Sequence, residues 1–503
     1  MLKTLSGHWP LVAAHRGYPR RRAPKDGWPA LGQALMEGKL ALLGLWGDRA
    51  EVHAAIYDVR SHDVAVLSQG VAEGHAASLG VFHPAAIRPE RALQDLLGIE
   101  LIGLPDGRAW LDHGRWPVGA PLRDSAGPCT PSARRTEFLP ADGPSLHQIA
   151  VGPVHAGIIE PGHFRFTAHG ETVVRLEERL GYVHKGIEKL IEGRDLEQSA
   201  HVAARVSGDS TVAYGWAFAG AAECALAVAV PARALALRAV MAECERVANH
   251  LGDIGAICND ASFSLMHAEC GILREQTLRA ATSAFGHRLM MDRIVPGGVA
   301  HDLADTGREA LNTLVRTIRR RFPELVELYD NTASLQDRSV GTGILQPNLA
   351  ESFAAGGYVG RGSGRSFDAR RDLPYAPYDT MVPRIPLRSE GDVDARVWIR
   401  IEEVQESIEL IDKLLLSLPG GPIRVAMPGV TDPCEATVLI EGFRGDVLAY
   451  VRFASGGRIE RCHLRDPSWF QWPLLEAAIE GNIVADFPLC NKSFNCSYSG
   501  HDL

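Results

Sequence analysis

The chain has 503 residues, which is more than one compact core usually holds, so two or three domains are expected. Its net charge of −9 and isoelectric point near 6.1 argue against a nucleic-acid-binding protein, which usually presents a basic face. Hydrophobic residues make up 46% of the chain, yet no run reaches the roughly 18 uncharged apolar residues that a membrane span needs. We therefore expect a cytoplasmic protein that meets a membrane only through partners.

The first part of the chain, residues 1–122, has the pattern of a small α/β unit. Apolar runs at 51–59 and 63–70 are bounded by polar turns and predict strands, and residues 89–97 predict a helix. The following stretch, 123–145, is rich in Pro, Gly and Ser, which is typical of a linker. We place the domain boundary in this linker.

The second part, residues 146–503, predicts short strands followed by a helix bundle. Apolar and polar residues alternate in 147–170, as in antiparallel strands, and residues 435–461 predict a β-hairpin or meander. Between these two regions apolar residues recur at spacings of three and four, which indicates amphipathic helices. The predicted helices span 171–190, 199–229, 232–257, 267–291, 303–336 and 401–418. The expected fold class is α+β.

An ordered series of segments carries a family resemblance. In the second part these are 152–155 (GPVH), 160–165 (EPGHFR), 181–193 (GYVHKGIEKLIEG), 204–223 (ARVSGDSTVAYGWAFAGAAE), 403–422 and 465–494. Together they resemble the large subunit of membrane-bound [NiFe] hydrogenases, nearest to hydrogenase-4 and formate hydrogenlyase, and the 49-kDa subunit of respiratory complex I. In the first part, residues 90–99 and 116–123 (WPVGAPLR) resemble the 30-kDa subunit of complex I.

The resemblance implies a nickel site, but the four cysteines that would hold it are missing. The early motif of the family has cysteines where this chain has Ser207 and Ser210, and the late motif places Ser497 and Gly500 at the ligand positions. Soft thiolates hold nickel, whereas a serine hydroxyl is a hard oxygen donor. A shift of one residue would bring Cys496 to the late motif, but one thiolate does not build the centre. We therefore predict no metal in this chain.

The resemblance also implies that the corresponding cavity binds a quinone headgroup close to a partner's iron–sulfur cluster. Near this cavity we expect His155, His163, Arg205, Asp209 and Glu188. Structural roles stay open for the two histidines. Glu188 is either a proton-relay group or a salt-bridge partner of a lysine at helical spacing.

These residues and motifs lead to one expected function and two alternatives. The resemblance implies a core subunit of a complex I-like, hydrogenase-4-like oxidoreductase on the cytoplasmic side of the membrane, in a class that includes NAD-binding and quinone-binding complexes and translocates ions. The expected partners are a small iron–sulfur subunit of the 20-kDa type and antiporter-like membrane subunits, and the chain itself is expected to bind no cofactor except quinone. The alternatives are a non-catalytic structural subunit and an active [NiFe] hydrogenase.

Overall fold

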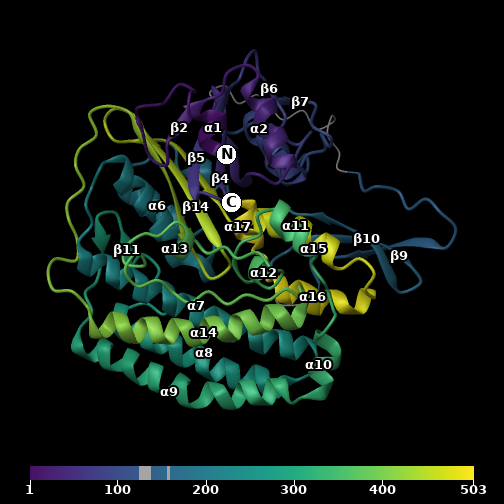
Figure 1. Cartoon of the computed structure of the whole chain (residues 1–503), viewed down its shortest axis with the longest axis vertical. Coiled ribbons are helices and arrows are strands. Elements are labelled where there is room, and N and C mark those ends of the chain that lie inside the picture. Colours follow the sequence, from purple (N-terminus) through teal and green to yellow (C-terminus); the bar gives the residue numbers. More distant parts are fainter. Residues whose placement is uncertain (124–136, 156–158) are drawn as a thin grey trace.

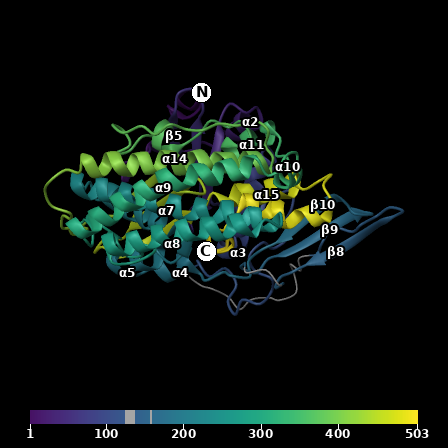
Figure 2. The same cartoon turned by 90° about the horizontal axis from the view of Figure 1, so that it is seen from below.

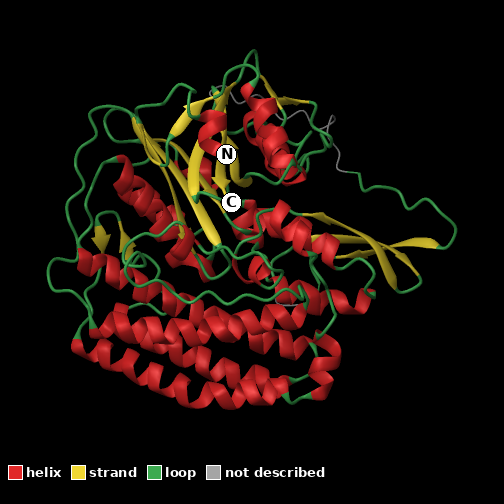
Figure 3. Ribbon diagram, in the orientation of Figure 1, coloured by secondary structure: helices red, strands yellow, loops and turns green. Residues whose placement is uncertain are grey.

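The computed structural model describes residues 1–123, 137–155 and 159–503. Four long helices lie together on one side of the molecule, and two four-stranded sheets lie on the opposite side (Figure 1). A three-stranded antiparallel sheet extends away from both (Figure 3). The predicted α+β class is confirmed.

The bundle consists of α7 (Ala232–Asp260), α8 (Ser264–Phe285), α9 (Asp305–Asp330) and α14 (Val393–Leu416). Both α7 and α9 pack against α8 and against α14, so each helix has two bundle neighbours (Figure 2). The outer helix α9 buries one apolar stripe at helical spacing, which consists of Leu311, Leu314, Val315, Ile318, Phe322, Leu325 and Tyr329. The predictions for these four helices are confirmed, although α14 begins at Val393 rather than at residue 401.

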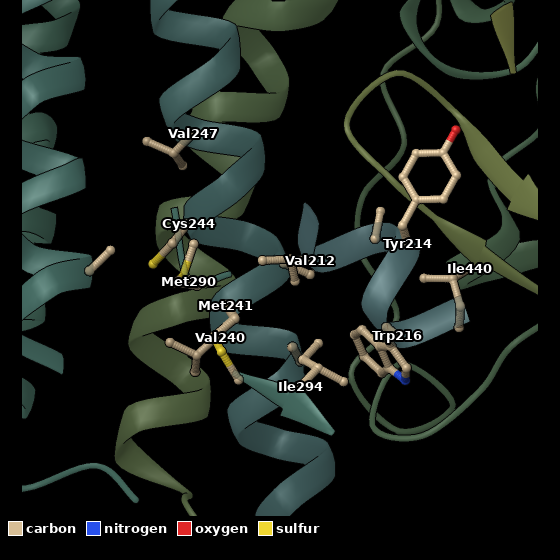
Figure 4. Packing of buried hydrophobic residues seen from close by; sticks show 14 of the residues in the cluster. Val212, Tyr214, Trp216, Val240, Met241, Cys244, Val247, Met290, Ile294 and Ile440 are labelled. Carbon is tan, nitrogen blue, oxygen red and sulfur yellow. The ribbon is translucent and has the colours of Figure 1, made fainter. Parts of the chain in front are cut away.

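A second layer lies between the bundle and the sheets. Here α5 (Leu196–Ala203) leads through a short 3₁₀ turn, η2 (Gly208–Ser210), into α6 (Thr211–Ala225). Helix α6 is buried on nearly all sides, because it packs on the C-terminal sheet and also contacts α7. Figure 4 shows Val212 on the side of α6 that faces Met241 and Cys244 of α7, whereas Tyr214 and Trp216 lie on the other side of α6.

The two four-stranded sheets share a core, and the N-terminal region also contributes one strand to the C-terminal sheet. The N-terminal sheet has the order β2 (Arg20–Arg22), β5 (Asp63–Gly70), β4 (Glu51–Asp58), β3 (Ala41–Gly47). The C-terminal sheet has the order β1 (His15–Gly17), β13 (Cys434–Glu441), β14 (Asp446–Phe453), β15 (Ile459–Arg465). Strand β1 pairs in parallel with β13, and Trp46 packs against Tyr450 between the sheets. The N-terminal residues therefore complete a sheet of the second part of the chain.

The remaining elements are short and surround these layers. In the N-terminal region they are α1 (Leu2–Ser6), α2 (Gly27–Met36), β6 (His75–Ala77), η1 (Pro84–Ala86), α3 (Ile87–Leu97) and β7 (Glu100–Ile102). Farther along the chain they are β11 (Ile294–Val295), β12 (Gly298–Val299), α10 (Ala333–Ser339), α11 (Pro347–Ser352), α12 (Gly357–Arg361) and α13 (Ala369–Asp372). The last elements are α15 (Ser468–Ala478), η3 (Val484–Asp486), α16 (Phe487–Phe494) and α17 (Tyr498–Asp502).

The predicted helix 171–190 is wrong. Its first half is β10 (Thr172–Arg179), which pairs with β9 (His163–His169), and β9 pairs in turn with β8 (Leu146–Val151). The pairing shifts between Val173 and Arg175, so the apolar residues lose their strict alternation and take on helix-like spacing. Only α4 (Ile187–Ile191) is helical in this stretch, because the chain turns through positive φ angles at Gly181 and Gly186.

Two further predictions concern the domain boundary and membrane spans. Most of the proposed linker, residues 124–136, lies outside the described residues, so the boundary within 123–145 stays a prediction. In the part of the chain that is described, no helix combines the length and the apolar character needed to cross a membrane.

Candidate functional site

The four positions where the family has nickel ligands lie close together. Ser207 precedes the 3₁₀ turn before α6 and Ser210 is the last residue of that turn, while Ser497 and Gly500 lie at the start of α17. The hydroxyls of Ser497 and Ser207 are 3.4 Å apart, and Ser497 Oγ accepts a hydrogen bond of 2.9 Å from the Gly500 amide. The fold thus joins two segments that are almost 300 residues apart, with Ser497 as the N-cap of α17.

An ion pair accompanies these hydroxyls. Asp209 Oδ1 accepts hydrogen bonds from Ser207 Oγ at 2.6 Å and from Ser210 Oγ at 3.1 Å. Arg444, from the turn between β13 and β14, donates to Asp209 Oδ2 at 2.6 Å and to Ser210 Oγ at 3.1 Å. We call Ser207, Asp209, Ser210, Arg444, Ser497 and Gly500 the serine cluster. Burial opposes ionisation of Asp209, but the Arg444 guanidinium and the hydroxyl hydrogen bonds outweigh it and lower the pKa of this carboxyl to about 2.

The residues of the serine cluster do not fit a [NiFe] centre. Three hydroxyls and a glycine stand where four thiolates are needed, and a carboxylate–guanidinium pair lies beside them. A Cβ atom added at Gly500 would overlap Asp466 Oδ2 and lie 2.8 Å from Ser497 Oγ, so this backbone leaves no room for a ligand side chain. Asp466 is held in place by Tyr214, whose hydroxyl donates to it at 2.6 Å.

Cys496 does not take the place of Ser497. Its side chain is buried in the apolar cluster that contains Trp472 and Tyr498, while Ser497 is the residue whose hydroxyl reaches Ser207. Burial raises the pKa of the Cys496 thiol well above its usual value, so it stays protonated near neutral pH. Among the described residues, no group of three or more His, Cys, Asp or Glu side chains is placed to hold a metal ion.

A small cavity of about 100 Å³ opens beside the serine cluster, and Asp209 and Glu245 both line it. The Glu245 carboxylate accepts hydrogen bonds from the backbone amides of Val212 at 2.7 Å and Ala213 at 3.2 Å, at the start of α6. Burial outweighs these bonds and raises the pKa of Glu245 to about 8. A carboxyl that holds its proton near pH 7 therefore lies beside one that is ionised.

Two of the predicted cavity residues lie elsewhere. Arg205 is about half exposed and forms a two-pronged ion pair with Asp292, with both distances at 2.7 Å. Glu188 is buried and accepts hydrogen bonds from Arg461 at 2.7 Å and His463 at 2.6 Å, both of strand β15, and not from a lysine at helical spacing. The Arg461 guanidinium and the hydrogen bonds from both side chains outweigh the effect of burial and lower the pKa of Glu188 to about 2.

The segment that joins β8 to β9 contains His155 and ends at His163, which is the first residue of β9. His163 Nδ1 lies 3.2 Å from the carbonyl oxygen of Gly152, and its ring packs beside Phe138. Burial lowers the pKa of His163. The same segment contacts α17, because Glu160 accepts a hydrogen bond of 3.1 Å from the Ser499 amide. His155 lies in the loop of this segment, away from any strand.

Arg444, Glu245 and Asp466 were missed by the sequence analysis. Arg444 lies in the tight turn at residues 441–446 (EGFRGD), so its charged side chain stands between two buried strands. That combination is a usable signal, because a charged side chain in a buried turn needs a partner. Glu245 gave no signal, since a single acid on an amphipathic helix is ordinary.

Comparison with known proteins places these observations in a family. The family described as respiratory-chain NADH dehydrogenase, 49 Kd subunit, matches residues 263–438, and the corresponding 30 Kd family matches residues 29–128. Formate hydrogenlyase subunit 5 of Escherichia coli is 32% identical over 83% of this chain and 75% of its own length. The carbon monoxide-induced hydrogenase of Rhodospirillum rubrum is 31% identical over 70% of this chain and 98% of its own length.

A solved structure agrees with these relatives. A chain from the membrane-bound sulfane sulfur reductase, an archaeal respiratory membrane complex, superposes with a TM-score of 0.68 at 25% identity and covers 71% of this chain and 99% of its own. The chain therefore belongs to the family that includes the large subunit of formate hydrogenlyase and the 49-kDa subunit of respiratory-chain NADH dehydrogenase, with a 30-kDa-type region in the same polypeptide.

Proposed function

We propose that this chain is the electron-accepting core subunit of a membrane-associated complex of the complex I and hydrogenase-4 type, and that it works without a [NiFe] centre. Electrons arrive from an iron–sulfur cluster of a small partner subunit and pass to quinone or another acceptor at the serine cluster. Antiporter-like membrane partners, on whose cytoplasmic side the chain lies, couple this transfer to ion movement. The observation that carries the proposal is the Asp209–Arg444 pair among three serines, where thiolates would be needed for nickel.

The same groups suit the reduction of a carbonyl-type acceptor. A quinone that takes up two electrons also takes up two protons, so its site needs hydrogen-bond donors and a proton source. Arg444 and the serine hydroxyls are donors that favour a developing negative charge on oxygen. Glu245 keeps its proton near pH 7 and lines the adjoining cavity, so it is the proposed source of a proton.

A second candidate is a structural subunit without redox chemistry. The specific observation in its favour is that the serine cluster satisfies itself, because Asp209 and Arg444 bond each other and the hydroxyls of Ser207 and Ser210 bond Asp209. Polar networks whose members all bond one another also occur where their only role is to stabilise the fold.

Reoxidation of the partner's iron–sulfur cluster separates the two candidates. The purified complex is reduced chemically, then mixed with menadione, decylubiquinone or a sulfane-sulfur compound, and the cluster signal is followed by electron paramagnetic resonance. The proposal expects one of these acceptors to reoxidise the cluster, and expects Arg444→Met to slow this step at least tenfold. If no acceptor reoxidises the cluster faster in the native complex than in the Arg444→Met complex, the structural-subunit candidate replaces the proposal.

A further inference from the structure

A cavity of about 480 Å³ lies between the N-terminal region and the segment 364–372 that follows α12, and this volume is within the range of small-molecule sites. On the N-terminal side, residues in and next to α2, β3 and β4 line it, and Leu35, Leu40, Ala41 and Val59 make part of this wall apolar. Helix α11 lines it as well, whereas no residue of the serine cluster does. The cavity is therefore a separate place where a ligand can be sought.

Arg365 lines this cavity, and no carboxylate of the described residues forms an ion pair with it. The side chain is only 8% exposed, its Nη1 donates to the Ala355 carbonyl at 2.8 Å, and its guanidinium lies 4.5 Å from the ring centre of Phe367. In the described part of the chain, every other buried arginine has a carboxylate partner except Arg396. Each guanidinium nitrogen of Arg396 donates to an oxygen of the protein, so Arg365 is the exception.

Two nitrogens of Arg365, Nε and Nη2, have no hydrogen-bond partner among the described residues. They are also not among the unpartnered atoms that protein encloses fully, so open space reaches them, and Arg365 lines this cavity. The N–H groups of Nε and Nη2 are parallel and form the fork that holds a carboxylate by two bonds.

Two neighbours in the same segment show what this fork binds. The fork of Arg370 holds Asp368, with Nε at 3.0 Å and Nη2 at 2.7 Å from the two carboxylate oxygens. The fork of Arg371 holds Asp372 in the same way, at 2.9 Å and 2.8 Å. Arg365 presents the same fork to the cavity without a carboxylate from the described chain.

The other acids and arginines at the cavity favour a ligand with a single negative charge. Arg371 and Asp372 neutralise each other, and Glu351 lies on the exposed surface of α11, where solvent screens its charge. Burial lowers the pKa of Arg365, but an arginine remains charged near pH 7. One anion would balance this one buried cation, whereas a doubly charged phosphate would leave an excess of negative charge in the cavity.

We propose that this cavity binds a small organic monocarboxylate, whose carboxylate is held by Nε and Nη2 of Arg365 and whose apolar part packs against the N-terminal wall. This site is separate from the serine cluster, and its test needs no electron transfer, so its failure leaves the proposed function untouched.

The test is isothermal titration calorimetry of the native complex with benzoate and with hexanoate, each compared with its neutral amide. We expect at least one carboxylate to bind about tenfold or more tightly than its amide, because the amide lacks the charge that the guanidinium fork bonds. Inorganic phosphate should bind more weakly than that carboxylate.

Arg365→Met keeps an apolar stem beside Phe367 but removes the fork, so carboxylate binding should weaken about tenfold or more while amide binding stays unchanged. The unfolding midpoint of this variant should not fall, because a buried cation without a carboxylate partner is itself costly. Asn348→Asp adds a negative charge on the exposed part of α11 that lines the cavity, so it should also weaken carboxylate binding alone.

The control is Arg316→Met, which removes an exposed arginine of α9 that does not line the cavity and should leave binding unchanged. The inference is overturned if neither carboxylate binds more tightly than its amide, if phosphate binds more tightly than both carboxylates, or if Arg365→Met and Arg316→Met affect carboxylate binding equally.

Discussion

Two polar clusters in this molecule each pair arginine with carboxylate side chains, yet they differ in enclosure. The first is the serine cluster, which adjoins a cavity and whose Asp209 side chain is 35% exposed. The second lies between the bundle and the sheets, and we call it the bundle network: Glu243, Arg246, His250, Arg361, Asp368, Arg370, Glu403 and Glu441, each at most 2% exposed. The bundle network is enclosed by protein, which suits a structural role, whereas the serine cluster adjoins a cavity, which suits a functional site.

The bundle network is balanced internally. Arg361 pairs with Glu403, with Glu441 at 3.1 Å and with Asp368 at 3.2 Å, and His250 bonds Glu403 at 2.6 Å. Three arginines face four carboxylates, and burial together with the neighbouring Asp368 raises the pKa of Glu441 to about 7. A proton on Glu441 would balance the charge. The network thus connects α7, α12 and α14 with β13.

The largest effect on stability is therefore expected from the bundle network. Arg361→Met removes the cation that three carboxylates share, and breaking a buried pair in this way costs about 3–5 kcal/mol in the free energy of unfolding. Denaturant unfolding of the chain measures this loss. Arg316→Met is the control, since Arg316 is exposed and its solvent-screened pair with Glu309 should contribute little to stability. Equal losses in the two variants would contradict the structural role of the bundle network.

The serine cluster should instead respond mainly in electron transfer. Asp209→Asn keeps the shape but removes the charge that faces Arg444, so we expect acceptor reduction by the complex to fall about tenfold or more. The unfolding free energy should fall less than in Arg361→Met, because Asp209 is partly exposed. A variant that loses stability but keeps its rate of cluster reoxidation would make this cluster structural as well.

Glu245 gives a pH-dependent comparison. Its folded-state pKa of about 8 lies above the ordinary glutamate value. At a pH between these two values, Glu245 is protonated in the folded chain and ionised in the unfolded chain. Stability therefore falls as pH rises through this window, by up to about 1.4 kcal/mol per pH unit from this group. Glu245→Gln should remove that slope and raise the unfolding midpoint at pH 8 relative to pH 5. An unchanged pH profile would contradict the assignment of a protonated Glu245.

The smallest effect is expected from a single hydroxyl. Ser497→Ala removes the N-cap of α17 and its contact with Ser207, which should cost about 1 kcal/mol in unfolding free energy. Cluster reoxidation should change less than twofold, because Arg444 and Asp209 remain. Ser417→Ala, which removes an exposed hydroxyl bonded to a backbone carbonyl, is the control. A tenfold loss of rate in Ser497→Ala would move the chemistry from the ion pair to the hydroxyls.

The sequence predicts the elements of this fold best where the apolar residues follow a single periodicity, either that of a helix or that of a strand. The bundle helices and the meander β13–β15 follow such patterns, and both were predicted. The stretch 171–190 was not, because a bulge after Val173 gives a strand the apolar spacing of a helix. The spacing of apolar residues within 171–190 does not include the pairing of this strand with the preceding strand β9, and that pairing decides the outcome.

The candidate site was predictable to the extent that motifs mark it. Ser207, Ser210, Ser497 and Gly500 were named from two motifs far apart in sequence, and the fold brings them together. Arg444 was not named, because its role depends on the turn that carries it back to Asp209. Arg205 was named wrongly for a similar reason. It is next to the motif in sequence, but its side chain points to Asp292.

The central claim is that this member of the family works without nickel. Elemental analysis of the purified native complex, as nickel and iron atoms per copy of this chain, tests it most directly. The account predicts iron at the level of the partner's clusters and nickel far below one atom per chain. Nickel close to one atom per chain would contradict it, because the serine cluster would then hold a metal despite its hydroxyls, its glycine and the Asp209–Arg444 pair.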